Sequence, residues 1–294
     1  MRRRRVIIIL AVCLLVVICL IAFWPGEHEP EYKGKKLSQW LALQNDHPEE
    51  VDTAVRAIGT NALPILIKWA EFQLPAWRFR LFKLYTKFPS PLRHPSLAGF
   101  IADDKQQVRA YNSVFGFQVL GTNVSSAAPE LIRFLSDKRN QGRETVALAL
   151  AYVGGPNSLP ALLAAVQDKT TPDMQRALVA RAISHLNYRG PDLSNAVPVM
   201  IACLQETNQF VPSLAATALG TFLLQPDQSV PALTKALESS DYRVRRNAIR
   251  SLGKFGLQAT NALDAISKAL TDPQKDVRRQ ATNALRQIAP EKDF

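Results

Sequence analysis

Apolar residues spaced three and four apart recur in short runs along the chain, and the runs return at a nearly constant interval. The step between runs is 31, 34, 31, 38, 33 and 33 residues. Apolar residues at that spacing form one stripe on a helix, and a period in this range with two short helices per unit is typical of an α-solenoid. Such units bury their apolar faces only against their neighbours. We therefore predict an all-α fold over residues 37–294, an α-solenoid of about seven helix pairs. The runs share a proline or its equivalent near their start: Pro64, Pro95, Pro129, Pro160, Pro198, Pro231 and Asp264.

Short polar segments separate the predicted helices. Glycines, as in "IGTNALP" and "LGTNVSSAAP", favour the left-handed backbone that ends a helix. Asn61, Ser126, Asn157 and Asn195 each precede a run by the same interval, and we expect their side chains to cap first-turn amides. At the N-terminal end of the array we expect Trp40 to close the core against water.

The first 36 residues differ from the rest of the chain. Residues 1–5 form a basic segment with four arginines, residues 6–24 carry no charge, and residues 25–36 combine proline, glycine and charges. Nineteen apolar residues nearly match the hydrocarbon core of a bilayer, and flanking arginines stay on the cytoplasmic side. The pattern predicts a transmembrane signal-anchor at 6–24, an extended tether at 25–36 and a solenoid outside the cytoplasm, periplasmic or cell-surface in a bacterium. Cleavage as a signal peptide and acylation at a cysteine of the apolar segment stay open as alternatives.

A second recurrence places an aspartate in a turn and an arginine early in the helix that follows. Examples are Asp104 with Arg109, Asp137 with Arg143, Asp241 with Arg245, and Asp272 or Asp276 with Arg278. With this feature, residues 48–290 resemble HEAT-repeat proteins, and the last two units look most like the HEAT-like repeats of the phycobilin-lyase type. The resemblance implies that these aspartates and arginines form a ladder between neighbouring repeats. It implies no lyase activity, because no bilin-attachment motif is visible.

Two segments depart from the repeat pattern. The helix predicted at 76–89, "AWRFRLFKLYTKFP", has five aromatic residues where other units use alanine and leucine. We expect most of them in the core, with an exposed partner-binding patch as the alternative. The 38-residue step adds a longer loop around Arg189, Gly190 and Pro191.

No residue pattern predicts catalysis. The four histidines lie in different units or in the tether, without a second ligand at metal-binding spacing, and no nucleophile elbow, phosphate loop or dinucleotide fingerprint follows a strand. Cys203 lies within an apolar run and is expected to be a small buried side chain. We predict no catalytic residue, no cofactor and no metal.

Positive charge gathers at the C-terminal end. The formal net charge is +11, and residues 229–294 hold 12 Lys and Arg against 7 Asp and Glu. Stacking of the last two units would merge exposed arginines of their second helices into one basic patch, which we predict as the binding site: Arg243, Arg246, Arg250, Arg279 and Arg286. A solvated face without function is the other interpretation of this patch.

The sequence thus predicts a non-catalytic, membrane-anchored module for protein–protein interaction or scaffolding outside the cytoplasm. A protein partner is expected, with membrane contact through residues 6–24. The alternative is a basic-patch solenoid that binds nucleic acid or another anionic polymer. The predicted anchor argues against nucleic acid as the partner.

Overall fold

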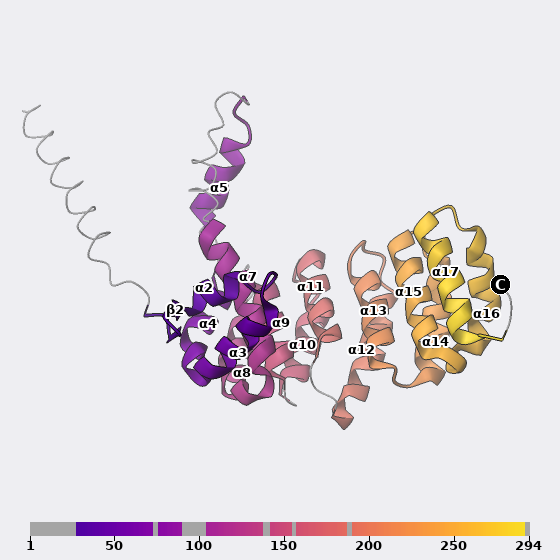
Figure 1. The fold of residues 1–294 in the computed structure, drawn as a ribbon. Coiled ribbons are helices and arrows are strands. Elements are labelled where there is room, and N and C mark those ends of the chain that lie inside the picture. Colours follow the sequence, from indigo (N-terminus) through magenta and orange to yellow (C-terminus); the bar gives the residue numbers. More distant parts are fainter. Residues whose placement is uncertain are drawn as a thin grey trace, which may run out of the picture.

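The computed structural model describes residues 28–72, 76–89, 104–137, 142–154, 157–186 and 190–291, which form an array of short helices (Figure 1). The helices pack in pairs, and each pair packs against the next, so the predicted all-α solenoid is confirmed for the described residues. The pairs are α2 (Leu37–Ala42) with α3 (Pro48–Ile58), α4 (Leu63–Ala70) with α7 (Asp104–Leu120), α8 (Ala128–Ser136) with α9 (Arg143–Val153), α10 (Ser158–Gln167) with α11 (Asp173–Ser184), α12 (Ala196–Leu204) with α13 (Val211–Phe222), α14 (Pro226–Lys235) with α15 (Tyr242–Phe255), and α16 (Leu263–Lys268) with α17 (Lys275–Ile288).

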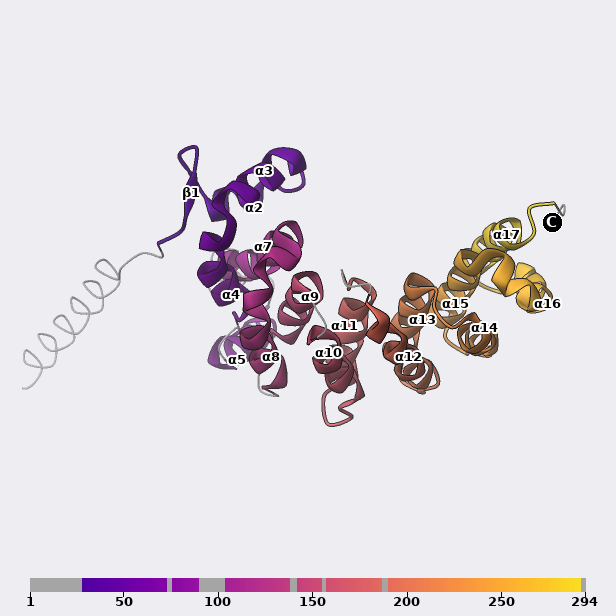
Figure 2. The same ribbon diagram turned by 90° about the horizontal axis from the view of Figure 1, so that it is seen from below.

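The array is curved, and its two rows of helices differ in position. Helices α7, α9, α11, α13, α15 and α17 stack in this order along the concave side and are called the inner helices (Figure 2). Helices α4, α8, α10, α12, α14 and α16 follow the convex side and are called the outer helices. The apolar side chains between the two rows form one continuous core, as expected for stacked repeats.

Tight turns connect the helices. Four glycines end inner helices or α3 with the predicted left-handed backbone, at φ values of 61°, 55°, 70° and 55° for Gly59, Gly121, Gly154 and Gly256. The predicted side-chain caps are not formed, because most of these glycines lead into a 3₁₀ turn that carries the chain directly into the next helix. The 3₁₀ segments are η1 (Gly59–Ala62), η3 (Gly121–Ala127), η4 (Pro191–Asn195), η5 (Ala236–Glu238), η6 (Gly256–Ala262) and η7 (Ala269–Thr271).

Small residues allow the last inner helices to approach closely. A Cβ atom at Gly220 of α13 would lie 2.7 Å from the Cα atom of Ser251 in α15. The Ser251 hydroxyl donates a hydrogen bond of 2.8 Å to the carbonyl of Ala216 across the same contact. One repeat later, a Cβ at Gly253 would lie 3.1 Å from the Cα of Ala284 in α17. The inner row is therefore packed backbone against backbone at its C-terminal end.

Arginines near the start of inner helices join each pair to the following one. Arg245 of α15 bonds both carboxylate oxygens of Asp272, at 2.7 and 2.9 Å, and Asp272 lies in the turn of the next pair. Arg176 of α11 bonds both carboxylate oxygens of Glu206 in the same way, at 2.6 and 2.9 Å. Arg143 of α9 donates to the Thr171 hydroxyl at 2.7 Å.

These contacts correct the pairing suggested by the sequence. Arg245 does not pair with Asp241 of its own turn, because its side chain extends along the stack towards the following turn. The last arginine of the series, Arg278, has no following turn among the described residues. It donates instead to the carbonyls of Asp272 and Pro273, at 2.6 and 3.0 Å.

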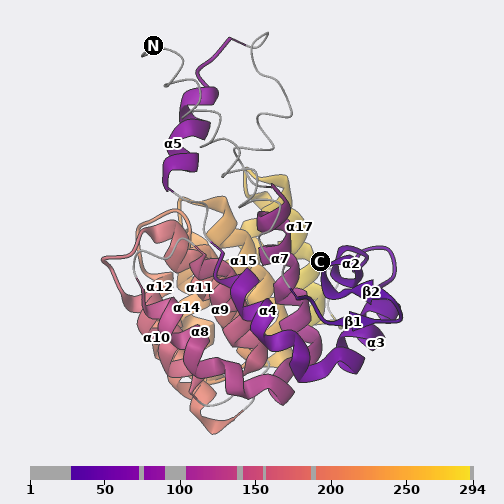
Figure 3. The same ribbon diagram turned by 90° about the vertical axis from the view of Figure 1, so that its left-hand side faces the viewer.

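One segment is inserted into the array instead of forming a repeat of its own. Helix α4 packs directly against α7, and Gly116 of α7 leaves room for the side chain of Leu66. Helix α5 (Ala76–Tyr85) forms no substantial contact with the other described helices and stands away from the body of the solenoid (Figure 3). The runs at Pro64 and Pro95 therefore do not begin two successive pairs. Pro95 itself lies outside the described residues.

The aromatic side chains of this insertion are only partly described. Tyr85 is buried, and Phe88 is 44% exposed. The side chains of Trp77, Phe79 and Phe82 lie outside the described residues. The predicted core position of the aromatic residues is thus not met by α5 as a member of the helix stack.

The N-terminal end of the array is covered by a β-hairpin. Strands β1 (Glu31–Tyr32) and β2 (Lys35–Lys36) pair antiparallel where the sequence predicts an extended tether. Glu29, just before the hairpin, accepts hydrogen bonds from the backbone of Ser38 at 2.8 Å and from Arg109 at 3.2 Å. Trp40 is buried and donates to the carbonyl of Tyr32, so it closes the end of the core together with the hairpin. A buried ion pair and an aromatic contact hold this segment on the solenoid.

The predicted localisation as a single-pass membrane protein is corrected. In the described ranges between residues 28 and 291, no helix combines the length and the apolar character needed to cross a membrane. The longest of them, α7, has 17 residues and includes charged side chains, whereas a bilayer span needs about 20 apolar residues. The predicted span itself, residues 6–24, lies outside the described residues.

Candidate binding groove

Helix α15 is covered on three sides, which leaves one face for contact with a partner. It packs against α14 in its own pair, α13 before it and α17 after it. Asn247 points towards α13, where its amide donates to the carbonyl and hydroxyl of Ser213 at 3.0 and 2.9 Å. The remaining face, at three- and four-residue spacing, carries four cations on the concave side: Arg243, Arg246, Arg250 and Lys254.

A groove lies between this face and the last helix. Its volume is about 410 Å³, and it is lined by Arg250 and Lys254 from α15, by Arg286 from α17 and by the polar side chains of Gln280, Asn283 and Gln287, besides Ala284. No carboxylate lines it. Among the described residues none of the three cations forms an ion pair. We call Arg250, Lys254, Arg286 and these polar residues the basic groove.

The cations of the basic groove influence one another. The pKa of the Lys254 ammonium is lowered, first by partial burial and then by the positive charge of Arg250. Like charges held close together in this way attract an anion that reaches both. The guanidinium groups can bind a carboxylate through two parallel hydrogen bonds, which gives the groove a geometric preference for carboxylates or phosphates.

The structure divides the five predicted site residues. Arg250 and Arg286 lie together in the basic groove. Arg243 is engaged by Asp241 at 2.7 Å, and Arg279 pairs with Asp276 at 2.9 Å on the exposed surface. Arg246 lies beside the groove, half-buried, with its Nε 3.3 Å from the amide oxygen of Asn247. These positions leave the functional role of the patch a prediction.

Sequence reasoning overlooked four members of the groove. Lys254 follows Arg250 by one helical turn, and its position was visible in the spacing. Asn283 and Gln287 lie 33 residues after Arg250 and Lys254, which is the repeat interval. That interval is the signal that could have identified them, whereas nothing singles out Gln280.

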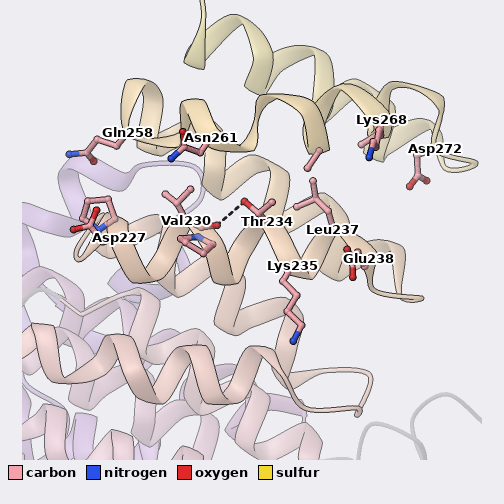
Figure 4. A pocket seen from close by; sticks show the side chains of 14 residues that line it. Asp227, Val230, Thr234, Lys235, Leu237, Glu238, Gln258, Asn261, Lys268 and Asp272 are labelled. Atoms are coloured by element: carbon pink, nitrogen blue, oxygen red, sulfur yellow. Dashed lines mark hydrogen bonds between the residues drawn. The ribbon is translucent and has the colours of Figure 1, made fainter.

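A second groove lies on the outer side, between α14 and α16 (Figure 4). It has a volume of about 740 Å³, and its charges are mixed: Asp227, Glu238 and Asp272 lie with Lys235 and Lys268. The carboxylate of Asp272 is already bonded to Arg245. The outer groove thus has room for a ligand but no charge preference, in contrast to the basic groove.

Few residues offer chemistry beyond binding. In the part of the chain that the structure describes, no three His, Cys, Asp or Glu side chains gather closely enough to hold a metal ion. The Cys203 thiol is buried as predicted, and burial raises its pKa to about 11. A thiol with so high a pKa is a poor nucleophile at neutral pH.

Comparison with protein families identifies repeats of one type. A family model described as HEAT repeats matches residues 197–286, and a model described as the PBS lyase HEAT-like repeat matches residues 143–168. The chain is thus supported as a HEAT-repeat protein, although the two segments cover less than half of it. The phycobilin-lyase type of repeat matches at 143–168 and not in the last two units, where the sequence placed it. No curated protein matches the chain.

Solved structures resemble the chain only distantly. An engineered protein from a structural genomics consortium is 20% identical, with 86% of this chain and 96% of that chain covered and a TM-score of 0.41. A second engineered protein is 16% identical, with 87% and 99% covered and a TM-score of 0.46. Human deoxyhypusine hydroxylase in complex with glycerol is 18% identical, with 87% and 95% covered and a TM-score of 0.37. TM-scores below 0.5 carry no information about activity.

Proposed function

We propose that this protein is a non-catalytic interaction scaffold and that its basic groove binds an acidic segment of a protein partner. One observation carries the proposal. Arg250, Lys254 and Arg286 converge without a carboxylate among them, while Arg176, Arg181 and Arg245 all have acidic partners. The HEAT-repeat solenoid is consistent with a scaffold of this kind.

The physical argument concerns the groove's unsatisfied charge. Cations engaged in ladder contacts hold the repeats together and cannot serve a partner without a loss of stability. Cations without a partner stay solvated, and an acidic segment can bind them by replacing water. Each exposed pair contributes about 0.2–1 kcal/mol, so three cations together support roughly tenfold effects on affinity.

Nucleic acid is the less favoured partner, because the positive charge does not continue along the concave face. A single strand carries a phosphate about every 3.4 Å, so its binding sites need cations along the whole path. The neighbouring inner helix α13 presents Thr217 and Thr221 instead, and Arg181 of α11 is paired with Glu144 at 2.7 Å. A short acidic segment matches this confined charge better.

Binding of defined probes to the full chain tests the proposal. The probes are a fluorescent twelve-residue peptide with four consecutive glutamates, its glutamine counterpart and a single-stranded DNA of equal charge. The groove variant combines Arg250→Gln, Lys254→Gln and Arg286→Gln. The control variant Arg133→Gln, Lys235→Gln, Lys268→Gln removes three exposed cations from outer helices, so the net charge changes equally.

We expect the acidic peptide to bind in low salt, to weaken with added salt, and to lose roughly tenfold or more affinity in the groove variant. The control variant should stay within about twofold of the unmodified protein. Equal losses in both variants would show that only net charge matters and would overturn the proposal. DNA that binds tighter than the peptide and depends on the same three residues would replace it with the nucleic-acid alternative.

A further inference from the structure

The concave face changes its chemistry from one end to the other. Corresponding positions of successive inner helices hold Tyr152, His185, Thr221 and Lys254, at intervals of 33, 36 and 33 residues. The series therefore runs from aromatic on α9, through small and neutral on α13, to basic on α15. Because these helices are stacked in order, the change follows the length of the array (Figure 2).

The aromatic end is a contiguous surface formed by three inner helices. Tyr111 of α7 is 60% exposed. The rings of Tyr152 and His185 are 6.1 Å apart and tilted by 46°. Burial raises the pKa of the Tyr152 hydroxyl, and the nearby Tyr111 acts in the same direction, which places the two tyrosines close to each other. We call Tyr111, Tyr152 and His185 the aromatic surface.

The charges beside the aromatic surface are already neutralised. Glu144 of α9 and Arg181 of α11 form an ion pair of 2.7 Å, and each side chain is about one-third exposed. Exposed tyrosines next to a satisfied ion pair are typical of contact sites for apolar and aromatic side chains, because Tyr supplies contact area at a low entropic cost. This end of the concave face therefore favours an uncharged part of a ligand.

The distance between the two ends can be given in residues. Three helix steps separate α9 from α15, and packed helices lie about 8–10 Å apart, so the span is about 24–30 Å. An extended chain advances about 3.3 Å per residue, so about seven to nine residues bridge the span. A helix would need about twice as many residues for the same span.

We propose that the ligand of the concave face is an extended polypeptide segment in which an acidic cluster and an aromatic residue are separated by about eight residues. The acidic cluster binds in the basic groove and the aromatic residue on the aromatic surface, with the threonines of α13 beneath the connecting chain. The acidic half of this assignment rests on the proposed function, and the aromatic half is independent of it. Thr217 and Thr221 bond carbonyls of their own helix, so they offer a smooth path without competing charge.

Three fluorescent peptides of equal length test the spacing with the full chain. All contain four consecutive glutamates in a Gly/Ser sequence. The first has a tryptophan eight residues away from the glutamates, the second has it two residues away, and the third has serine in its place. The variant Tyr111→Ser, Tyr152→Ser removes the aromatic surface, and Tyr111→Ser alone serves where the double variant lowers the helical circular dichroism.

Tyr242→Ser is the matched control, because Tyr242 is also exposed but lies at the start of α15, away from the aromatic surface. We expect the first peptide to bind roughly tenfold tighter than the other two, as one desolvated aromatic contact supports. This advantage should disappear in the tyrosine variants, persist in Tyr242→Ser and remain in high salt, where the contribution of the glutamates fades.

The outcomes separate the two proposals. Equal affinity for the three peptides, with binding still dependent on the basic groove, would overturn the extended segment and leave the proposed function intact. An advantage of the first peptide that survives the tyrosine variants would also overturn it. Absence of binding to all three peptides in low salt would overturn the proposed function itself.

Discussion

Arg176 is the most buried charged side chain of the ladder, and its removal should destabilise the solenoid strongly. Its side chain is 1% exposed, and it donates to Glu206 at 2.6 and 2.9 Å, to Asp173 at 3.0 Å and to the carbonyl of Val166 at 2.8 Å. The replacement Arg176→Met keeps an unbranched side chain of similar reach but leaves the Glu206 carboxylate, at 14% exposure, without its main partner. Breaking a buried ion pair from one side costs about 3–5 kcal/mol.

The expected loss lies at the lower end of that range. Glu206 keeps two weaker partners, because the ammonium of Lys169 and the amide of Asn208 also donate to it. The carbonyl of Val166 loses a donor, which adds about 1 kcal/mol. We expect the free energy of unfolding to fall by about 3 kcal/mol in Arg176→Met, measured at pH 7 by urea titration with the slope compared between proteins. In the control Arg279→Met the ion pair is exposed, at 64% and 46%, and the loss should stay below about 1 kcal/mol.

The same prediction has a pH dependence with a defined sign. Burial by itself would raise the pKa of Glu206, but the hydrogen bonds from Arg176 and Lys169 outweigh it and hold the pKa below its ordinary value. A depressed carboxyl pKa contributes stability above the unfolded value, about pH 4.3, and this stability is lost as the pH falls through the folded pKa. The difference between the unmodified protein and Arg176→Met should therefore shrink in acid. A loss under 1 kcal/mol at pH 7, or a difference that stays constant down to the lowest pH at which both proteins are folded, would refute the reasoning.

Two further predictions concern the contacts between repeats. Arg245→Gln should lower the free energy of unfolding by about 1–3 kcal/mol, because Asp272 is 8% exposed and loses both bonds, whereas Arg278→Gln should cost less because it bonds only carbonyls; equal losses in urea titration would contradict the ladder. Gly220→Ala should lower the thermal midpoint clearly, because the new Cβ meets the Cα of Ser251, whereas Gly116→Ala meets the mobile end of Leu66 and should cost less. A Gly220→Ala protein that melts with the unmodified one would show that α13 and α15 are less closely packed.

The repeat array was predictable from the sequence, but its internal division was not. Apolar spacing and the glycines at helix ends identify the pairs from α8 to α17, because each helix there packs against its neighbours in sequence. The segment around Pro95 has the same local pattern as a repeat. Only the contact between Leu66 and Gly116 shows that α4 pairs with α7 across the insertion, and such a long-range contact has no local signal.

The candidate site was predictable to the extent that helical and repeat periods determine it. Arg250 and Arg286 share a face because both lie on inner helices at nearby repeat positions. Arg279 has an acidic residue three positions earlier, so its exposed pair was visible in the sequence. The hairpin over Trp40 was not predicted, because the burial of Glu29 depends on Arg109, eighty residues away.

The position of Arg243 follows from a substitution in the repeat before it. Val211 and Pro212 in α13 occupy the positions of Val244 and Arg245 in α15, so α13 lacks the arginine that would bond the turn of the next pair. Asp241 in that turn consequently has no partner from the preceding repeat, and a half-buried carboxylate requires one.

Arg243 supplies the missing partner from the other side of the contact. It bonds Asp241 at 2.7 Å, donates to the carbonyl of Gln209 at 3.3 Å, and lies 5.8 Å from the centre of the Phe210 ring. The contact between the two repeats is thus restored, but by a side chain that would otherwise face the concave surface. A proline at one ladder position therefore removes one arginine from the basic surface of the next repeat, and the cations left without a partner are those of the basic groove.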